Sequence, residues 1–141
     1  DDKGEYDRAI ADCDRAIALK PDYAEAYYNR GIAYRHKGEH DRAIADYTKA
    51  IALEPNCAKA YNNRGNAYGQ KGEYNRAIAD FDRAIALKPD YADAYYNRAV
   101  AWYFKKDYDR AWADVKRCRE HGGTPNPKLI ELLRKASGRS E

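Results

Sequence analysis

Two pairs of side chains in this sequence have the types and the spacing of a chemical site. Cys118 and His121 stand three residues apart, so a helix would place a thiol beside an imidazole, as a cysteine nucleophile or a metal site requires. Cys118 nevertheless occupies a position that holds alanine in two earlier segments, which favours a packed core thiol. His36 and His40 would give a metal two ligands without a third, and we predict a solvated turn there.

Other catalytic patterns are missing from the sequence. The two serines, Ser137 and Ser140, lie at the C-terminal end, and the chain has no phosphate-binding glycine loop, dinucleotide fingerprint or H-E-x-x-H metal motif. The three cysteines show no C-x-x-C spacing, which argues against a zinc ribbon and a disulfide framework. We therefore predict that the chain is not an enzyme and that it holds no metal and no cofactor.

Three arginines and three aspartates recur at steps of 34 residues. The pairs are Arg30 with Asp46, Arg64 with Asp80, and Arg98 with Asp114. A buried arginine needs a carboxylate partner, so the common offset within each pair predicts ion pairs between two helices of one structural unit. The alternative is a ladder of cations that binds an anionic ligand.

The same step of 34 residues orders the rest of the chain. Residues 24–57 and 58–91 are identical at 21 of 34 positions, and Pro21, Pro55 and Pro89 keep the step. Within each copy the apolar residues recur at helical spacing, so each copy predicts two helices joined by a short turn. We predict these helices over residues 24–36, 39–53, 58–70, 73–87, 92–105 and 107–121.

The two ends of the array differ from its centre. Residues 1–23 are predicted as a half-repeat that contains only a second helix, over residues 5–19, and Asn126 predicts the N-cap of a capping helix over residues 126–136. Asp22 and Glu25 predict a capping box for the helix at 24–36. The segments are 1–23 for the half-repeat, 24–57, 58–91 and 92–125 for three full repeats, 126–136 for the capping helix and 137–141 for a loose tail.

Aromatic and small residues keep the same offsets in successive copies. In the first copy they are Tyr27, Gly31, Tyr34, Ala43, Tyr47 and Pro55. This pattern resembles the tetratricopeptide repeat (TPR), although arginine stands where that family usually has leucine, and the third copy lacks the glycine and the proline. The resemblance implies an all-α, right-handed α-solenoid of about three full repeats, an N-terminal half-repeat and a C-terminal capping helix, which together form one domain.

The resemblance also implies where a partner binds, because in this family the first helices line a concave groove. The side chains at the groove-facing positions are Tyr28, Ile32, Arg35, Asn62, Asn66, Tyr96, Val100 and Tyr103. The outer copies thus offer aromatic and aliphatic surface, and the middle copy offers amides that can bond a peptide backbone. For Tyr103 the alternative is packing against the capping helix.

The predicted function is a non-catalytic interaction module, or scaffold, that binds a peptide segment of a protein partner in this groove. Two alternatives stay open: a structural self-assembly unit that uses its end helices, and a regulatory TPR fragment of a larger protein such as a glycosyltransferase. The net charge of +3 and the shortness of every apolar run predict no nucleic-acid partner and no membrane partner. The chain has an odd number of cysteines, scattered along the sequence, which favours a cytoplasmic location.

TPR modules that hold the C-terminal carboxylate of heat-shock chaperones use Lys and Asn in one copy, Asn in the next, and Lys and Arg in a third. The corresponding positions here are Tyr28, Ile32, Asn63, Asp93 and Asn97. One of the five agrees, and Asp93 would repel a carboxylate. The resemblance therefore predicts no tight binding of such tails.

The helix over residues 5–19 would lack a preceding first helix to cover its small-residue face. Ala9, Cys13 and Ala16 lie on that face at helical spacing and are expected to contact solvent, with Tyr6 and Ile10 partly covered. Alanine at a crossing allows two helices to approach closely. Such a helix either frays or contacts a second copy, and we predict a weak, concentration-dependent homodimer through residues 5–19.

Overall fold

Helix-forming residues fill the segments between the turns, and the structure follows this pattern. The computed structural model describes residues 2–140, so residues 1 and 141 of the predicted end segments lie outside the described residues. The described residues form eight α-helices and no strand: α1 (Asp2–Leu19), α2 (Ala24–His36), α3 (His40–Leu53), α4 (Ala58–Gln70), α5 (Tyr74–Leu87), α6 (Ala92–Phe104), α7 (Tyr108–Glu120) and α8 (Pro127–Ser137). Each predicted helix is present, with bounds that differ by at most three residues at either end.

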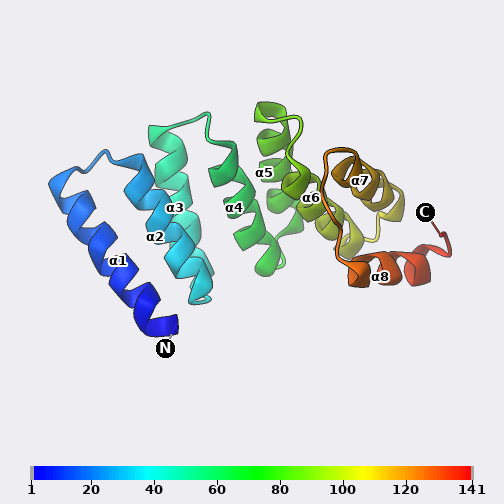
Figure 1. Cartoon of the computed structure of the whole chain (residues 1–141), viewed down its shortest axis with the longest axis horizontal. Helices are drawn as coiled ribbons and strands as arrows, with labels where there is room; N and C mark the ends of the chain where they lie inside the picture. Colours follow the sequence, from blue (N-terminus) through cyan, green and yellow to red (C-terminus); the bar gives the residue numbers. More distant parts are fainter. Residues whose placement is uncertain (1, 141) are drawn as a thin grey trace.

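Each helix packs against its neighbour in the chain, and together they form one row from α1 to α8 (Figure 1). In addition, α2 contacts α4, and α4 contacts α6. The first helices of successive copies therefore lie side by side as one layer. The predicted all-α solenoid is confirmed.

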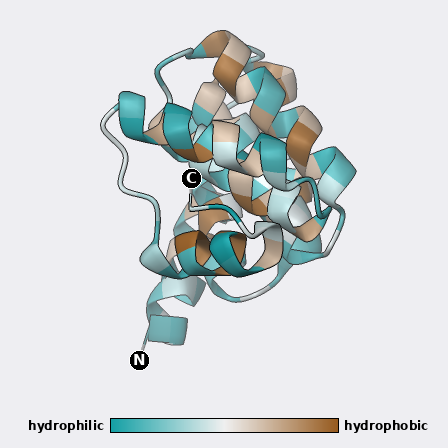
Figure 2. Ribbon diagram, turned by 90° about the vertical axis from the view of Figure 1, so that its right-hand side faces the viewer, coloured by the Kyte–Doolittle hydropathy of each residue, from teal (hydrophilic) through white to brown (hydrophobic). Residues whose placement is uncertain are grey.

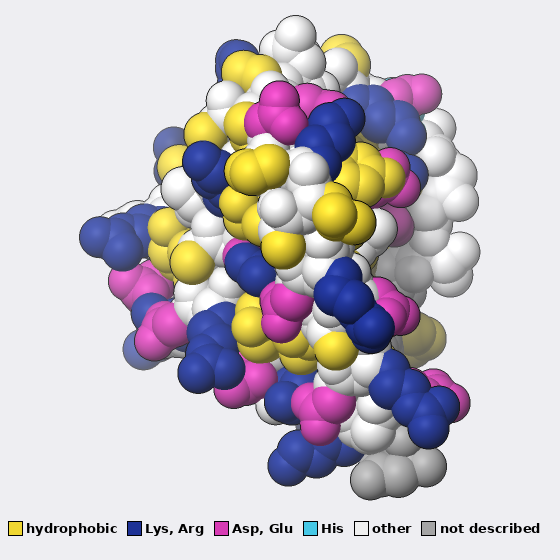
Figure 3. Space-filling view, turned by 90° about the vertical axis from the view of Figure 1, so that its left-hand side faces the viewer, with side chains coloured by type: hydrophobic (Ala, Val, Ile, Leu, Met, Phe, Trp, Pro, Cys, Tyr) yellow, Lys and Arg dark blue, Asp and Glu magenta, His cyan; other side chains and the backbone are white. Residues whose placement is uncertain are grey.

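The two ends of the row present different surfaces. At the C-terminal end, α8 buries Leu129, Ile130 and Leu133 against Trp112 and Val115 of α7. Hydrophobic and hydrophilic residues alternate along the helices at this end (Figure 2). At the opposite end, apolar side chains stand between many charged ones on the surface (Figure 3). The row is thus closed by an apolar helix contact at one end and open at the other.

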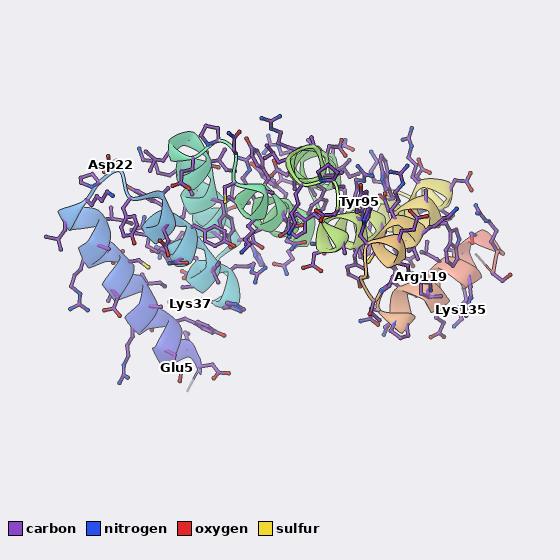
Figure 4. The ribbon with its side chains drawn as sticks, turned by 45° about the horizontal axis from the view of Figure 1, so that its top comes forward. Glu5, Asp22, Lys37, Tyr95, Arg119 and Lys135 are labelled. Atoms are coloured by element: carbon purple, nitrogen blue, oxygen red, sulfur yellow. The ribbon has the colours of Figure 1, made fainter. Side chains whose placement is uncertain are left out.

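The predicted helix caps are right at one end of the chain and wrong at the other. Asn126 caps α8, where its side-chain oxygen accepts a hydrogen bond from the Lys128 amide at 2.9 Å. The capping box of Asp22 is wrong: Asp22 lies in the loop between α1 and α2 (Figure 4), and the residue before α2 is Tyr23, which makes no side-chain cap. Because α2 begins at Ala24, as predicted, the residue at the cap position is Tyr23 and not Asp22.

The arginine and aspartate pairs join the two helices of each repeat. Both oxygens of each aspartate accept hydrogen bonds from one guanidinium at 2.7–2.8 Å, in the pairs Arg30–Asp46, Arg64–Asp80 and Arg98–Asp114. The three aspartates are buried. The hydrogen bond to Asp80 raises the pKa of Arg64 and keeps its guanidinium charged. These contacts use the arginines within the fold, which supports the structural interpretation over an anion-binding ladder.

A second series of contacts joins the turn after each first helix to the second helix of the preceding repeat. Lys37 lies beside α1 (Figure 4), where its Nζ contacts Asp7 at 2.6 Å, and Lys71 makes the same contact with Asp41 of α3 at 2.6 Å. Arg139 continues the series beyond α8 and binds Asp109 at 2.5 Å. The residues after α8 therefore mimic the turn of a further repeat. The carboxylates of these pairs are exposed, so each pair adds little stability.

Gly31 and Gly65 allow large aromatic rings to fill the space between paired helices. A Cβ on Gly31 would lie 2.7 Å from Cε1 of Tyr47, and a Cβ on Gly65 would lie 2.6 Å from Cε1 of Phe81. Both distances are shorter than van der Waals contact allows. Each glycine is therefore required by the ring that packs on it.

Candidate functional site

A pocket of about 500 Å³ lies between α4 and α6, on the layer formed by the first helices. Its lining residues are Asn66, Gly69, Gln70, Tyr74, Phe81, Tyr96, Asn97, Val100, Ala101 and Phe104. Asn66, Tyr96 and Val100 belong to the predicted groove set. None of the ten lining residues carries a formal charge. The pocket therefore combines apolar walls with amide groups, which suits an uncharged ligand segment.

One wall of the pocket is a pair of stacked rings, and its opening depends on a missing side chain. Tyr74 and Phe104 stack with their centroids 5.1 Å apart, and Phe104 is 53% exposed although it is apolar. Gly69 leaves the space beside them empty, since a Cβ there would meet only the Ala77 methyl, at 3.9 Å. An exposed ring beside an empty volume is a feature of binding surfaces.

Asn62 does not offer its amide to the groove, contrary to the prediction. It is 5% exposed, its Nδ2 donates to the Tyr91 hydroxyl at 3.3 Å, and its Oδ1 accepts from Asn97 Nδ2 at 3.0 Å. A buried amide must satisfy both of its ends within the fold, and these two bonds do so. Asn62 therefore positions Asn97, which lines the pocket.

The three predicted residues of α2 lie one repeat away from the pocket. Tyr28, Ile32 and Arg35 are half-buried, and the Tyr28 hydroxyl accepts a hydrogen bond from Asn63 Nδ2 at 2.8 Å. Burial raises the pKa of Tyr28. These residues therefore lie in the repeat that precedes the pocket, on the same layer of first helices.

Tyr103 lies outside the pocket. Its ring is 6.1 Å from that of Tyr108 and packs against the core formed with α8, so the packing alternative describes it better than a groove role. Tyr96 and Val100 contact the same core and also line the pocket, so they connect the pocket wall to the core.

The prediction omits Tyr74 because it places groove residues on first helices alone. Tyr74 begins a second helix, and its ring reaches the end of the following first helix. The sequence contains a signal for this pair, since Tyr6 and His36 also carry rings at the same repeat positions, and in the structure those rings stack at 4.9 Å. A stacked pair in one repeat indicates a stacked pair in another.

Of the pairs singled out for catalysis or metal binding, Cys118, His121 and His36 are used in packing. The His121 ring stacks on Tyr95 with centroids 5.5 Å apart, and Cys118 is buried, which raises the pKa of its thiol. The rings of His36 and Tyr6 stack likewise. Residues 2–140 contain no cluster of three or more potential metal-binding side chains. None of the helices in that span is both long and apolar enough to cross a membrane.

The fold defines a helical-repeat module with a pocket between α4 and α6. A model of the tetratricopeptide repeat matches residues 24–57, a second matches residues 46–79, and a TPR repeat model matches residues 2–35 and 65–106. The chain belongs to the tetratricopeptide repeat family. No protein with a curated description matches the sequence.

Solved structures of TPR proteins resemble this chain over most of its length. A crystal structure of MamA is 26% identical, with a TM-score of 0.84, over 98% of this chain and 82% of MamA. The first TPR of Spaghetti (RPAP3), bound to the HSP90 peptide SRMEEVD, is 30% identical, with a TM-score of 0.75, over 82% of this chain and 90% of that one. The TPR2B domain of yeast Sti1, in its complex with pHsp70, is 29% identical, with a TM-score of 0.75. This match covers 82% of this chain and 96% of that domain's chain. The family and these peptide complexes support a protein-interaction module.

Proposed function

We propose that this chain is a non-catalytic interaction module that holds a peptide segment of a protein partner along its layer of first helices. The observation that supports this proposal most directly is the uncharged pocket between α4 and α6, in which an exposed Phe104 ring stands beside amide groups. Amides bond a peptide backbone, and the apolar walls accept one of its side chains. The three cysteines are free, which agrees with a cytoplasmic location.

The ligand we propose differs from the tails in the two complexes above. The pocket has no lysine or arginine, and Asp93 is exposed at one of the positions where tail-binding modules carry a cation. An uncharged pocket gains nothing from a terminal carboxylate, which would have to lose its water there. An internal peptide segment therefore fits this pocket better than a charged tail.

Filling the pocket at Gly69 should abolish peptide binding without harming the fold. Gly69→Gln places a side chain in the empty volume, and glutamine favours a helix by somewhat under ~1 kcal/mol relative to glycine. We expect a displayed library of short random peptides to yield binders to the natural chain, and those binders to lose at least about tenfold in affinity with Gly69→Gln.

Gly4→Gln is the matched control for that substitution. Gly4 is also a helical glycine with open space around its Cβ, but it lies on α1, far from the pocket in the row of helices. It should keep full peptide binding. Equal binding by both variants would contradict the pocket as the peptide site.

A second candidate function is self-association through α1. No residue of α1 is buried, and Leu19, at its end, is 89% exposed. Ala9 is exposed as predicted, whereas Cys13 and Ala16 are half-buried. The Arg30 side chain of α2 reaches across to Asp14 of α1. The apolar surface between the charges at this end (Figure 3) supports an interface with a second copy. The regulatory-fragment alternative stays a prediction.

The dimer should be weak and should depend on concentration. The apolar strip on one helix is far smaller than the ~800 Å² per partner of a standard stable interface. Sedimentation equilibrium should show the average mass rising from monomer towards dimer as the protein is concentrated. Ala9→Glu should keep the chain monomeric, whereas Ala45→Glu, at an exposed alanine of α3, should not. A strict monomer at every concentration would exclude this interface.

A further inference from the structure

The repeat positions that line the pocket between α4 and α6 recur one repeat earlier, where α2 contacts α4. The positions 34 residues before Gly69, Tyr74 and Phe81 hold Arg35, His40 and Tyr47. We call the space around these three residues the first-repeat subsite. The same fold therefore presents an uncharged pocket in one repeat and a group of polar side chains, one of them cationic, in the neighbouring repeat.

Arg35 is the cation of this subsite, and no acidic side chain neutralises it. Three other arginines of the first helices, Arg30, Arg64 and Arg98, are each bound to a buried aspartate. Within residues 2–140, Arg35 is half-buried and its side chain makes no ion pair and no hydrogen bond. A half-buried guanidinium without a carboxylate retains its full capacity to bind an anion.

Tyr47 brings a hydrogen-bond donor to the same place. Its side chain is fully buried, and its hydroxyl has no hydrogen-bond partner within the described residues. Burial raises the pKa of Tyr47 to about 12, while the nearby Arg35 lowers it, so the hydroxyl keeps its proton at neutral pH. Phe81 fills the equivalent position without a hydroxyl and lines the pocket there. An unpaired buried hydroxyl costs stability, so its presence needs a reason beyond packing.

We propose that the first-repeat subsite binds the carboxylate side chain of an aspartate or glutamate on the partner peptide, through Arg35 and with Tyr47 as a second donor. The idea rests on the proposed function, because it concerns the same peptide along the same layer of helices. His40 Nδ1, also buried without a partner, lies at the edge of the subsite. The ligand carboxylate binds Arg35 first. It contacts the buried Tyr47 hydroxyl after the side chains that cover this hydroxyl change their rotamers.

The two neighbouring sites define the order of side chains in the peptide. Packed helices lie ~8–10 Å apart, and α2 contacts α4 directly. An extended peptide advances ~3.3 Å per residue, so the carboxylate and the apolar side chain should stand roughly three residues apart. The partner peptide therefore carries an internal acidic residue and, roughly three residues before or after it, an apolar residue.

Selection from a displayed library of short random peptides tests this order directly. The enriched peptides should share an aspartate or glutamate at that distance from an apolar residue. A synthetic peptide with the enriched sequence should lose about tenfold in affinity when its glutamate is changed to glutamine. Arg35→Gln should cause the same loss, and combining the two changes should add little more.

Three further measurements serve as controls for the same synthetic peptide. Arg42→Gln, at an exposed arginine paired with Glu39, should leave its affinity unchanged. Tyr47→Phe should weaken binding by a smaller factor, about threefold, without lowering the unfolding temperature. Amidation of the peptide's C-terminus should have no effect.

The outcomes separate this inference from the proposed function. Enriched peptides without an acidic residue, or full binding by Arg35→Gln, would overturn the carboxylate subsite and leave the pocket as a peptide site. A loss on amidation but not on the glutamine change would assign the site to a tail carboxylate instead. If no peptide is enriched, the proposed function fails as well.

Discussion

Asp80→Ala is expected to lower the free energy of unfolding by about 3–5 kcal/mol, because it removes one half of a buried ion pair. Asp80 is 6% exposed, and both of its oxygens accept hydrogen bonds from Arg64 at 2.8 Å. Without the carboxylate, the remaining side-chain hydrogen bond of Arg64 is to the Thr48 hydroxyl, at 3.2 Å. A charge in this position then has neither full hydration nor a counter-charge.

The equivalent aspartate-to-alanine substitutions in the outer repeats should lower the free energy of unfolding by less, since the arginines there bind a second carboxylate. Arg30 also binds Asp14 at 2.9 Å, and Arg98 also binds Asp82 at 2.9 Å, at the position that Thr48 occupies in the middle repeat. Asp46→Ala should therefore cost up to about 1 kcal/mol less than Asp80→Ala. Urea unfolding, with the denaturant midpoint as readout, measures both.

Thr48→Asp provides the decisive comparison for this prediction. Added to Asp80→Ala, it gives Arg64 the second carboxylate of the outer repeats and should recover up to about 1 kcal/mol. Asp90→Ala, at an exposed aspartate, should change stability by less than about 0.5 kcal/mol. Equal losses in the middle and outer repeats, with no recovery by Thr48→Asp, would show that the second carboxylate does not matter.

The features that the sequence predicts well are those that recur in every repeat. The helices, the offset between Arg64 and Asp80, and the close approach at Gly65 all follow from positions that keep the step of 34 residues. Recurrence identifies a packing role because each unit must bury the same faces against its neighbours. The structure departs from the predicted Asp22 cap, where one polar residue beside a proline was the whole signal.

The candidate site is harder to predict because it depends on positions that vary. Asn62 satisfies the pattern of a groove residue, yet its burial is decided by Tyr91 and Asn97, which approach it from more distant parts of the chain. The pocket itself exists because Gly69 has no side chain and the Phe104 ring leans on Tyr74. Both are tertiary contacts that periodicity along one helix does not contain.

Gly65→Ala should lower the free energy of unfolding by about 1–3 kcal/mol, although alanine favours helix over glycine by ~1 kcal/mol. The added Cβ would lie 2.6 Å from Cε1 and 2.9 Å from Cδ1 of Phe81. Phe81 is buried and packs against Ala77, Ile78 and Ala101, so a shift of its ring away from the added methyl would disturb these contacts. Thermal unfolding should show the loss directly, whereas Gly4→Ala on exposed α1 should raise stability slightly.

The third repeat shows which second substitution should relieve that clash. At the positions of Gly65 and Phe81 it carries Ala99 and Val115, both buried, so a smaller side chain accompanies the added methyl. Phe81→Val alone should cost about 2–3 kcal/mol because it leaves a cavity. The double variant should then cost about as much as Phe81→Val alone, because the methyl added by Gly65→Ala enters the space that the ring vacates. Strictly additive losses in the double-mutant cycle would mean that the ring and the glycine are not coupled. In that case, the exchange of residues between repeats would need a different physical cause.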